Sequence, residues 1–267
     1  MANRVTEIAR FPAAEARQGV AVDGEHFYAI DDRAIGKYEK ASGRRVARFE
    51  GPADGAISHL NGGVVVGQRL YCAHSNYPDI PPTSSVEIWE TGALAHVASH
   101  SFGVSDGWLT WIDFYQDAWW AVFAHYDKTK AKTGRDAAST RLVRLGPRWQ
   151  REAAWVLPAE LLRRFGDYSS SGGSWASARD LYVTGHDAPE LYVVRLPASG
   201  ATVELARVVP VPTPGQGIAW DRAQKGVLYA LDRARRDVVI LRIEGAASGG
   251  VGEARAPATP RPARHGR

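Results

Sequence analysis

The sequence has a single cysteine and no long apolar run. Cys72 alone cannot form an internal disulfide, and no Cys/His spacing typical of a zinc finger is present. No stretch approaches the roughly 20 apolar residues that a membrane helix needs, and residues 1–12 lack the apolar run of a secretion signal. We therefore expect a soluble, cytoplasmic protein that does not enter a membrane; removal of a signal peptide would make it periplasmic or secreted instead.

The chain also lacks a clustered basic face. Its formal net charge is +4 and its pI is near 9.2, but the C-terminal segment 246–267 carries a formal +3 of that charge. The remainder is nearly neutral, and no basic segment is interleaved with aromatic residues as in nucleic-acid-binding motifs. We expect no nucleic-acid partner.

What the sequence does contain is an internal repeat, whose spacing is typical of propeller blades. Five segments resemble one another at their openings and each reads as an inner strand. They are QGVAVD at 18–23, NGGVVV at 61–66, WLTWID at 108–113, SGGSWA at 171–176 and QGIAWD at 216–221. A β-sandwich of many short strands would share the turn spacing but would not predict five matched openings.

Each opening is followed by further runs with the alternation and β-propensity of strands. Second strands are expected at HFYAID, RLYCAH, WAVFAH, LYVTGH and VLYALD, and third strands at IGKYEK, SVEIWE, TRLVRL, ELYVVRL and DVVILRI. Four outer strands follow in RRVARFE, AHVASHSF, REAAWVL and TVELARVV, and the fifth is supplied by RVTEIARF near the N-terminus. The sequence thus predicts an all-β, five-bladed β-propeller, with the last blade closed by the N-terminal strand.

The propeller should occupy residues 1–245 as a single domain, and we expect a monomer. Residues 246–267, rich in Ala, Gly, Pro and Arg, read as a disordered basic tail. The best helix candidate is PAELLRRF at 158–165. Large tryptophans at three inner strands are expected to fill gaps between blades; they are Trp111, Trp175 and Trp220.

Polar residues recur where the second strand of each blade ends. The five equivalent positions hold Asp31, His74, His125, His186 and Asp232. Beside them, on the same face of a propeller, the inner strands begin. Their openings and flanks contribute Gln18, His59, Asn61 and Gln216. The register therefore predicts a polar, histidine-rich cluster at one mouth of the central channel.

This cluster has three interpretations. Imidazoles from three blades could hold a divalent metal ion, with His74, His125, His186, Asp31 and Asp232 as its ligands. Without a metal, His74, His125 or His186 could act as a catalytic acid or base while Gln18, His59, Asn61 and Gln216 bind the substrate. Alternatively, each polar residue could satisfy backbone groups of a neighbouring blade and contact no ligand.

Two loops should rim the same face. Residues 127–140, with Lys128, Lys130, Lys132 and Arg135, could form a lid that favours an anion or a plain solvated loop, and residues 75–84 contain three prolines. At the opposite end of the inner strands, three aspartates are expected as turn residues. They are Asp23, Asp113 and Asp221.

Several phrases together resemble a group of bacterial β-propeller proteins labelled cycloisomerase and described as similar to glutamine cyclotransferases. They are QGVAVDGEHFYAI, IGKYEKASG, LYCAHSNYP, SSVEIW, LTWID, WWAVFAHYD, LYVTGHDAPELYVVRLP and GQGIAWD, and they extend over residues 4–243. The resemblance implies a propeller fold and an enzyme acting on a small molecule.

From the residues and this resemblance we expect a lyase, cyclase or isomerase that acts on a small polar or anionic molecule at the channel mouth, with a metal ion as a further option. The alternative is a non-catalytic propeller that binds a ligand or a partner protein, because the fold hosts many unrelated functions.

Overall fold

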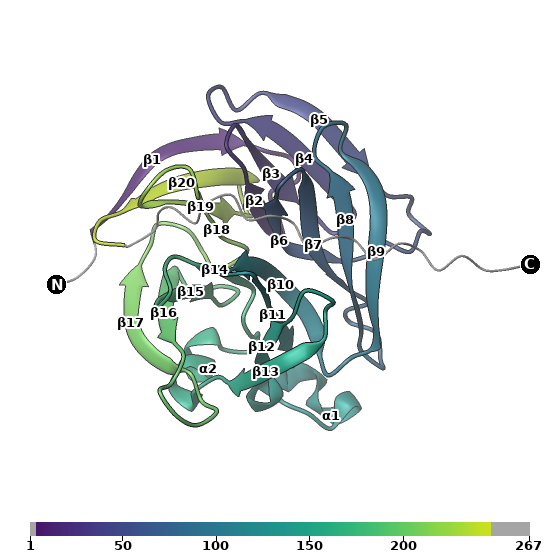
Figure 1. The fold of residues 1–267 in the computed structure, drawn as a ribbon, viewed down its shortest axis with the longest axis vertical. Coiled ribbons are helices and arrows are strands. Elements are labelled where there is room, and N and C mark those ends of the chain that lie inside the picture. The colour runs from purple at the N-terminus through teal and green to yellow at the C-terminus, as the bar shows by residue number, and fades with distance from the viewer. Residues whose placement is uncertain (1–3, 247–267) are drawn as a thin grey trace, which may run out of the picture.

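The computed structural model describes residues 4–246 and contains five antiparallel sheets of four strands each, arranged around a central axis (Figure 1). Blade one comprises β2 (Gly19–Val22), β3 (His26–Ile30), β4 (Ala34–Glu39) and β5 (Arg45–Glu50). Blade two comprises β6 (Leu60–Val66), β7 (Arg69–Ser75), β8 (Thr83–Glu90) and β9 (Ala95–Val104). The five-bladed propeller predicted from the repeats is confirmed.

The remaining blades follow the same order. Blade three contains β10 (Trp108–Tyr115), β11 (Ala118–Ala124), β12 (Arg141–Leu145) and β13 (Arg151–Val156). Blade four contains β14 (Gly172–Trp175), β15 (Leu181–Thr184), β16 (Glu190–Arg195) and β17 (Glu204–Pro210). Blade five contains β18 (Ala219–Trp220), β19 (Val227–Asp232) and β20 (Asp237–Ile243), and its outer strand is β1 (Val5–Pro12).

Strand β1 closes the ring as the sequence predicted. It pairs antiparallel with β20 from Val5 opposite Ile243 to Pro12 opposite Asp237. Near the Pro12 end of this pairing, the ring of Phe11 stacks on Phe27 of blade one, with centroids 5.8 Å apart. The first strand therefore joins the last blade to the first blade, and both ends of the described chain lie on the same side of the molecule.

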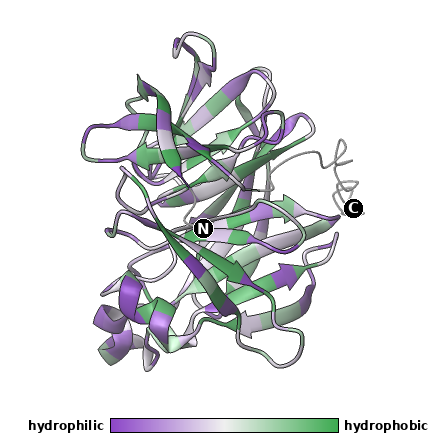
Figure 2. Ribbon diagram, turned by 90° about the vertical axis from the view of Figure 1, so that its left-hand side faces the viewer, coloured by the Kyte–Doolittle hydropathy of each residue, from purple (hydrophilic) through white to green (hydrophobic). Residues whose placement is uncertain are grey.

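The core lies between successive blades. Figure 2 shows hydrophobic residues alternating with hydrophilic ones along the strands, as expected when one side of each sheet packs against its neighbour. Trp111, Trp175 and Trp220 are at most 2% exposed and belong to these inter-blade clusters, so the packing role predicted for them is confirmed. A Cβ on Gly173 would lie 2.4 Å from the Trp111 ring, which explains the glycine in that strand opening.

One prediction about the three aspartates at the far end of the inner strands is wrong. Asp113 is not a turn residue: it lies within β10 and is 2% exposed. Its Oδ2 accepts a hydrogen bond from the Trp175 backbone N–H at 2.7 Å and pairs with Arg222 at 2.9 Å. Asp221 is likewise buried and pairs with Lys40 of blade one at 2.7 Å. Asp23 and Asp221 act as expected: Asp23 accepts the backbone N–H groups of residues 25 and 26, and Asp221 accepts those of residues 223 and 224.

The loop at 127–140 contains three short helical turns. It folds into the 3-10 turn η1 (Asp127–Thr129), the one-turn helix α1 (Lys130–Thr133) and the 3-10 turn η2 (Ala137–Ser139). The predicted helix is present as α2 (Ala159–Phe165). No helix among the described residues is long and apolar enough to cross a membrane. The predicted tail at 246–267 lies outside the described residues apart from Ala246.

Candidate functional site

The three histidines of the predicted cluster have different surroundings. His74, in β7, has both ring nitrogens engaged: Nε2 accepts the backbone N–H of Ser58 at 3.1 Å, and Nδ1 lies 2.9 Å from the Ser85 hydroxyl. Burial lowers the pKa of His74, which favours the neutral ring that can accept the Ser58 hydrogen bond. The surroundings of His74 match the structural interpretation of the cluster.

His186 is also engaged. Its ring stacks on Tyr168 at a centroid distance of 3.9 Å, and its Nδ1 lies 2.6 Å from Asp187. Arg233 donates to the other ring nitrogen. Burial, followed by the nearby Arg233 charge, lowers the pKa of His186. This histidine links blades four and five through contacts that occupy both of its nitrogens.

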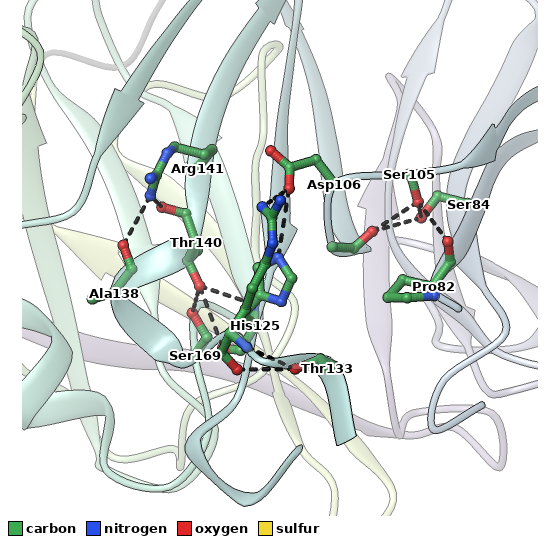
Figure 3. A network of polar contacts seen from close by, with 12 residues as sticks. Pro82, Ser84, Ser105, Asp106, His125, Thr133, Ala138, Thr140, Arg141 and Ser169 are labelled. Atoms are coloured by element: carbon green, nitrogen blue, oxygen red, sulfur yellow. Dashed lines mark hydrogen bonds and ion pairs between the residues drawn. The ribbon is translucent and has the colours of Figure 1, made fainter. Parts of the chain in front are cut away.

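His125 differs from both. It follows β11 directly, its side chain is 2% exposed, and neither ring nitrogen has a hydrogen-bond partner within residues 4–246. Its backbone N–H is held by the Thr140 hydroxyl at 3.0 Å, and that hydroxyl contacts the Ser169 hydroxyl at 2.9 Å. Buried side-chain nitrogens are normally hydrogen-bonded, so an imidazole with two free nitrogens stands out. Figure 3 shows how its backbone is fixed while the ring extends toward Asp106.

The charge state of His125 follows from its burial. Burial lowers its pKa below the ordinary value of 6.5, and the nearest opposing charge is Asp106, whose Oδ1 lies 3.9 Å from Nε2. Asp106 is more exposed and also pairs with Arg135 from the loop at 127–140. The ring is therefore neutral at neutral pH and has a carboxylate near enough to stabilise it once protonated.

The turn that carries Asp106 is held by hydroxyl groups. The Ser105 hydroxyl donates to the Gly107 carbonyl at 2.8 Å and contacts the Ser84 hydroxyl at 2.9 Å (Figure 3). Ser84 in turn accepts the backbone N–H of Leu109 at 3.0 Å. These bonds fix the backbone of the turn between β9 and β10 that carries Asp106.

His125 lines a pocket of about 550 Å³. One wall comes from the proline-rich loop after β7, through Ile80, Pro81 and Pro82, and the other from α1 and the residues after it. The second wall supplies Lys132 and Arg135, so two cationic side chains, one carboxylate and one imidazole surround the space. The two loops expected to rim one face do face each other here, and the pocket lies between blades two and three.

A second pocket of about 320 Å³ adjoins the first. The two share Val104, Ser105 and Asp106, and the second is walled by aromatic rings. Its aromatic residues are Phe102, Phe123 and Trp149. A pocket that contains charged side chains and adjoins an aromatic one can take a ligand that has a charged group at one end and an apolar group at the other.

The predicted substrate-binding residues form a separate cluster around a residue that the register argument did not name, Asp32. Its Oδ1 accepts a hydrogen bond from Gln18 at 2.7 Å and lies 2.9 Å from Nδ1 of His59, while Gln216 donates to Gln18 at 3.4 Å. Burial alone would raise the pKa of Asp32, but His59, Gln18 and the charge of Arg17 outweigh it and the pKa is lowered. Gln18 and His59 thus contact one ionised carboxylate directly, and Gln216 reaches it only through Gln18.

Asn61 does not join that cluster. It is buried, and its amide donates a long hydrogen bond, 3.5 Å, to the Leu109 carbonyl of blade three. The two aspartates of the predicted ring are also engaged in ion pairs. Asp31 pairs with Arg236 at 2.7 Å, and Asp232 pairs with Arg10 at 3.0 Å. These contacts tie blade five to blade one and to the closing strand.

No group of three or more His, Cys, Asp or Glu side chains that could hold a metal ion occurs in the described part of the chain. The predicted metal ligands His74, His125, His186, Asp31 and Asp232 instead have the separate surroundings described above. The register correctly placed each of them near the end of a second strand, but it could not show which partner each side chain selects. Asp106 and Asp32 were missed because they lie in turns, outside the repeated positions.

No protein-family model matches the sequence, and no curated protein matches it. Among solved structures, the chain is similar to a Thermus thermophilus protein provisionally described as an oxidoreductase (glucose dehydrogenase). Their identity is 12%, the match covers 90% of this chain and 99% of that chain, and the TM-score is 0.53. The WD40 repeats of RRP9 match at 11% identity over 84% and 79% of the two chains, with a TM-score of 0.49.

The similarity to the Thermus thermophilus protein supports the fold and nothing finer. The resemblance to cycloisomerase-labelled and glutamine cyclotransferase-like proteins is supported as far as the fold, and no family match extends it to an activity. The expected reaction type therefore remains a prediction that depends on the chemistry of the site itself.

Proposed function

We propose that the protein is a lyase or isomerase that acts on a small anionic molecule in the pocket beside His125. The observation that carries the proposal is the buried imidazole whose two nitrogens have no partner in the described chain while its ring lines a pocket. An unpaired buried polar group costs free energy, so its retention is explained if a ligand completes its hydrogen bonds. His74 and His186 have no such requirement.

Charge defines the substrate class. Lys132 and Arg135 are the cations that line the pocket, and they oppose the single carboxylate of Asp106. Arg135 pairs with Asp106 through Nη1, and the remaining N–H groups of its planar guanidinium can donate to a substrate carboxylate. The adjoining aromatic pocket would take an apolar substituent of the same molecule. A small carboxylic acid with an apolar or aromatic side group fits both spaces.

The mechanism follows from the state of His125. A neutral imidazole can take a proton from the carbon next to the bound carboxylate, and Asp106, 3.9 Å away, stabilises the imidazolium that forms. The electron pair released at that carbon forms a double bond. If a group leaves the next carbon, the reaction is an elimination; if the proton returns at a different carbon, it is an isomerisation.

Exchange of hydrogen in D₂O tests this proposal without knowledge of the natural substrate. We would incubate the protein with a panel of small 2-hydroxy and arylacetic acids and follow the loss of the signal of the hydrogen on the carbon next to the carboxylate by ¹H NMR. We expect exchange on at least one acid, and a decrease of roughly 10² to 10⁴ in its rate in His125→Leu, as for removal of a general base.

The matched control is His59→Leu, which changes the histidine of the Asp32 cluster and leaves the pocket intact. Exchange that survives in His59→Leu and is lost in His125→Leu supports the proposal. The reverse result moves the site to Asp32. Binding of an acid without exchange in any variant contradicts the enzymatic proposal and favours a non-catalytic propeller that binds a ligand.

A further inference from the structure

A cage of tyrosine rings lies on the same face as the His125 pocket and holds a lysine side chain. Three tyrosines from three blades surround the ammonium group of Lys128. The distances from Lys128 Nζ to the ring centroids are 3.7 Å for Tyr168, 5.5 Å for Tyr77 and 5.9 Å for Tyr126. We propose that this cage is a binding site for a quaternary ammonium group, and that Lys128 occupies it when no such ligand is bound.

The geometry of the rings supports a preformed site. Tyr77 and Tyr126 meet edge to face with centroids 5.2 Å apart, and Tyr126 meets Tyr168 in the same way at 6.2 Å. Two of the rings are backed by another ring: Tyr126 stacks on Trp108 and Tyr168 stacks on His186. Rings so supported keep their positions when the central cation is removed, which is the property that a cation-binding aromatic cage needs.

Lys128 is held in the cage by the tyrosines. No carboxylate pairs with it among residues 4–246, whereas Lys130, two residues further along, pairs with Asp136 at 2.9 Å. Burial alone would lower the pKa of Lys128, but its contacts with Tyr77 and Tyr168 outweigh burial and raise it, so the side chain is a cation. The occupant of the cage is thus positively charged, and it belongs to an exposed position of the 3-10 turn η1.

The ligand class follows from this arrangement. A quaternary ammonium is larger and more weakly hydrated than a lysine ammonium, so it gains more from three ring faces and loses less on leaving water. On one side the cage continues to a carboxylate: Tyr77 contacts His59, with centroids 5.4 Å apart, and His59 is 2.9 Å from ionised Asp32.

Choline and its neutral carbon analogue 3,3-dimethylbutan-1-ol provide the test. Titration is followed by isothermal calorimetry in the wild type, Lys128→Ala and the control Lys132→Ala, which removes a lysine of the same loop outside the cage. We expect choline to bind Lys128→Ala about tenfold more tightly than the wild type, since the competing cation is gone. Lys132→Ala should match the wild type, and the neutral analogue should bind none of them.

A second measurement uses the unaltered protein. Acetylation of lysines by an amine-specific reagent is quantified by peptide mass spectrometry with and without choline. Displacement from the cage should increase the acetylation of Lys128 by about twofold or more relative to that of Lys132. Equal binding of choline to Lys128→Ala and Lys132→Ala, binding of the neutral analogue as tightly as choline, or unchanged Lys128 acetylation at saturating choline would overturn the proposal.

Discussion

The Nε2 atom of His125 lies 3.9 Å from Oδ1 of Asp106, close enough for attraction and too far for a hydrogen bond. The backbone N–H of His125 is held by the Thr140 hydroxyl, and the turn that carries Asp106 is held by the hydroxyls of Ser84 and Ser105. Both residues line the pocket that also contains Lys132 and Arg135.

At residue 125, the imidazole that the proposed function requires should lower the stability of the fold. Replacing the unpaired imidazole in His125→Leu removes a buried polar group that has no partner in the described chain, and we expect the free energy of unfolding to rise by about 1 kcal/mol. In contrast, His74→Leu leaves the Ser58 N–H without its acceptor and should lower the free energy of unfolding by about 1 to 3 kcal/mol. Urea denaturation of both variants measures the difference. Equal destabilisation by the two substitutions would show that His125 is an ordinary structural histidine.

The pH dependence of stability follows from the same histidines. Burial holds the pKa values of His74, His125 and His186 below 6.5 in the folded protein. Well above pH 6.5 neither state carries these protons; below it the unfolded chain binds protons that the folded chain does not, so stability falls as the pH falls. We expect the melting temperature to decrease from about pH 7.5 to about pH 5.5, and to decrease less in His125→Leu. A melting temperature that rises on acidification across this window would contradict the account.

Much of the fold could be predicted because the five repeated segments correspond to the five blades. The twenty strands of the described chain lie where the alternation and the closing N-terminal strand indicated. The site was only partly predictable. The register identified His125, but nothing in the sequence distinguishes it from His74, because the difference lies in which backbone groups and hydroxyls happen to approach each ring. Side chains in turns, such as Asp106 and Asp32, escape any argument based on repeated strand positions.

The ion pair between buried Asp113 and partly exposed Arg222, at the other end of the channel, should matter for stability. Asp113 binds the Arg222 guanidinium and the Trp175 backbone, and so connects blades three, four and five. Asp113→Ala leaves the arginine without its carboxylate and should lower the free energy of unfolding by about 3 to 5 kcal/mol. The exposed Asp54 provides the control, and Asp54→Ala should change stability by less than about 0.5 kcal/mol. Similar values for both would exclude an inter-blade role for Asp113.

Closure of the ring can be tested within one strand. Phe11 and Ile8 are both apolar residues of β1, but Phe11 stacks on Phe27 of blade one whereas Ile8 is 44% exposed. We expect Phe11→Ala to lower the free energy of unfolding by about 2 to 3 kcal/mol, since the half-buried ring loses its packing. Ile8→Ala should change it by less than about 0.5 kcal/mol. Thermal and urea melts compare the two variants, and equal effects would mean that the Pro12 end of β1 does not help to close the propeller.

The most direct test of the central claim is ¹⁵N NMR of the histidine rings during titration with phenylacetate, a small acid whose carboxylate and ring suit the two adjoining pockets. The proposal predicts a saturable shift of the His125 ring nitrogens, small changes at His74 and His186, and loss of the His125 response in Arg135→Ala. An unchanged His125 signal at saturating phenylacetate, or a response centred on His59, would contradict the assignment of the pocket beside His125 as the binding site.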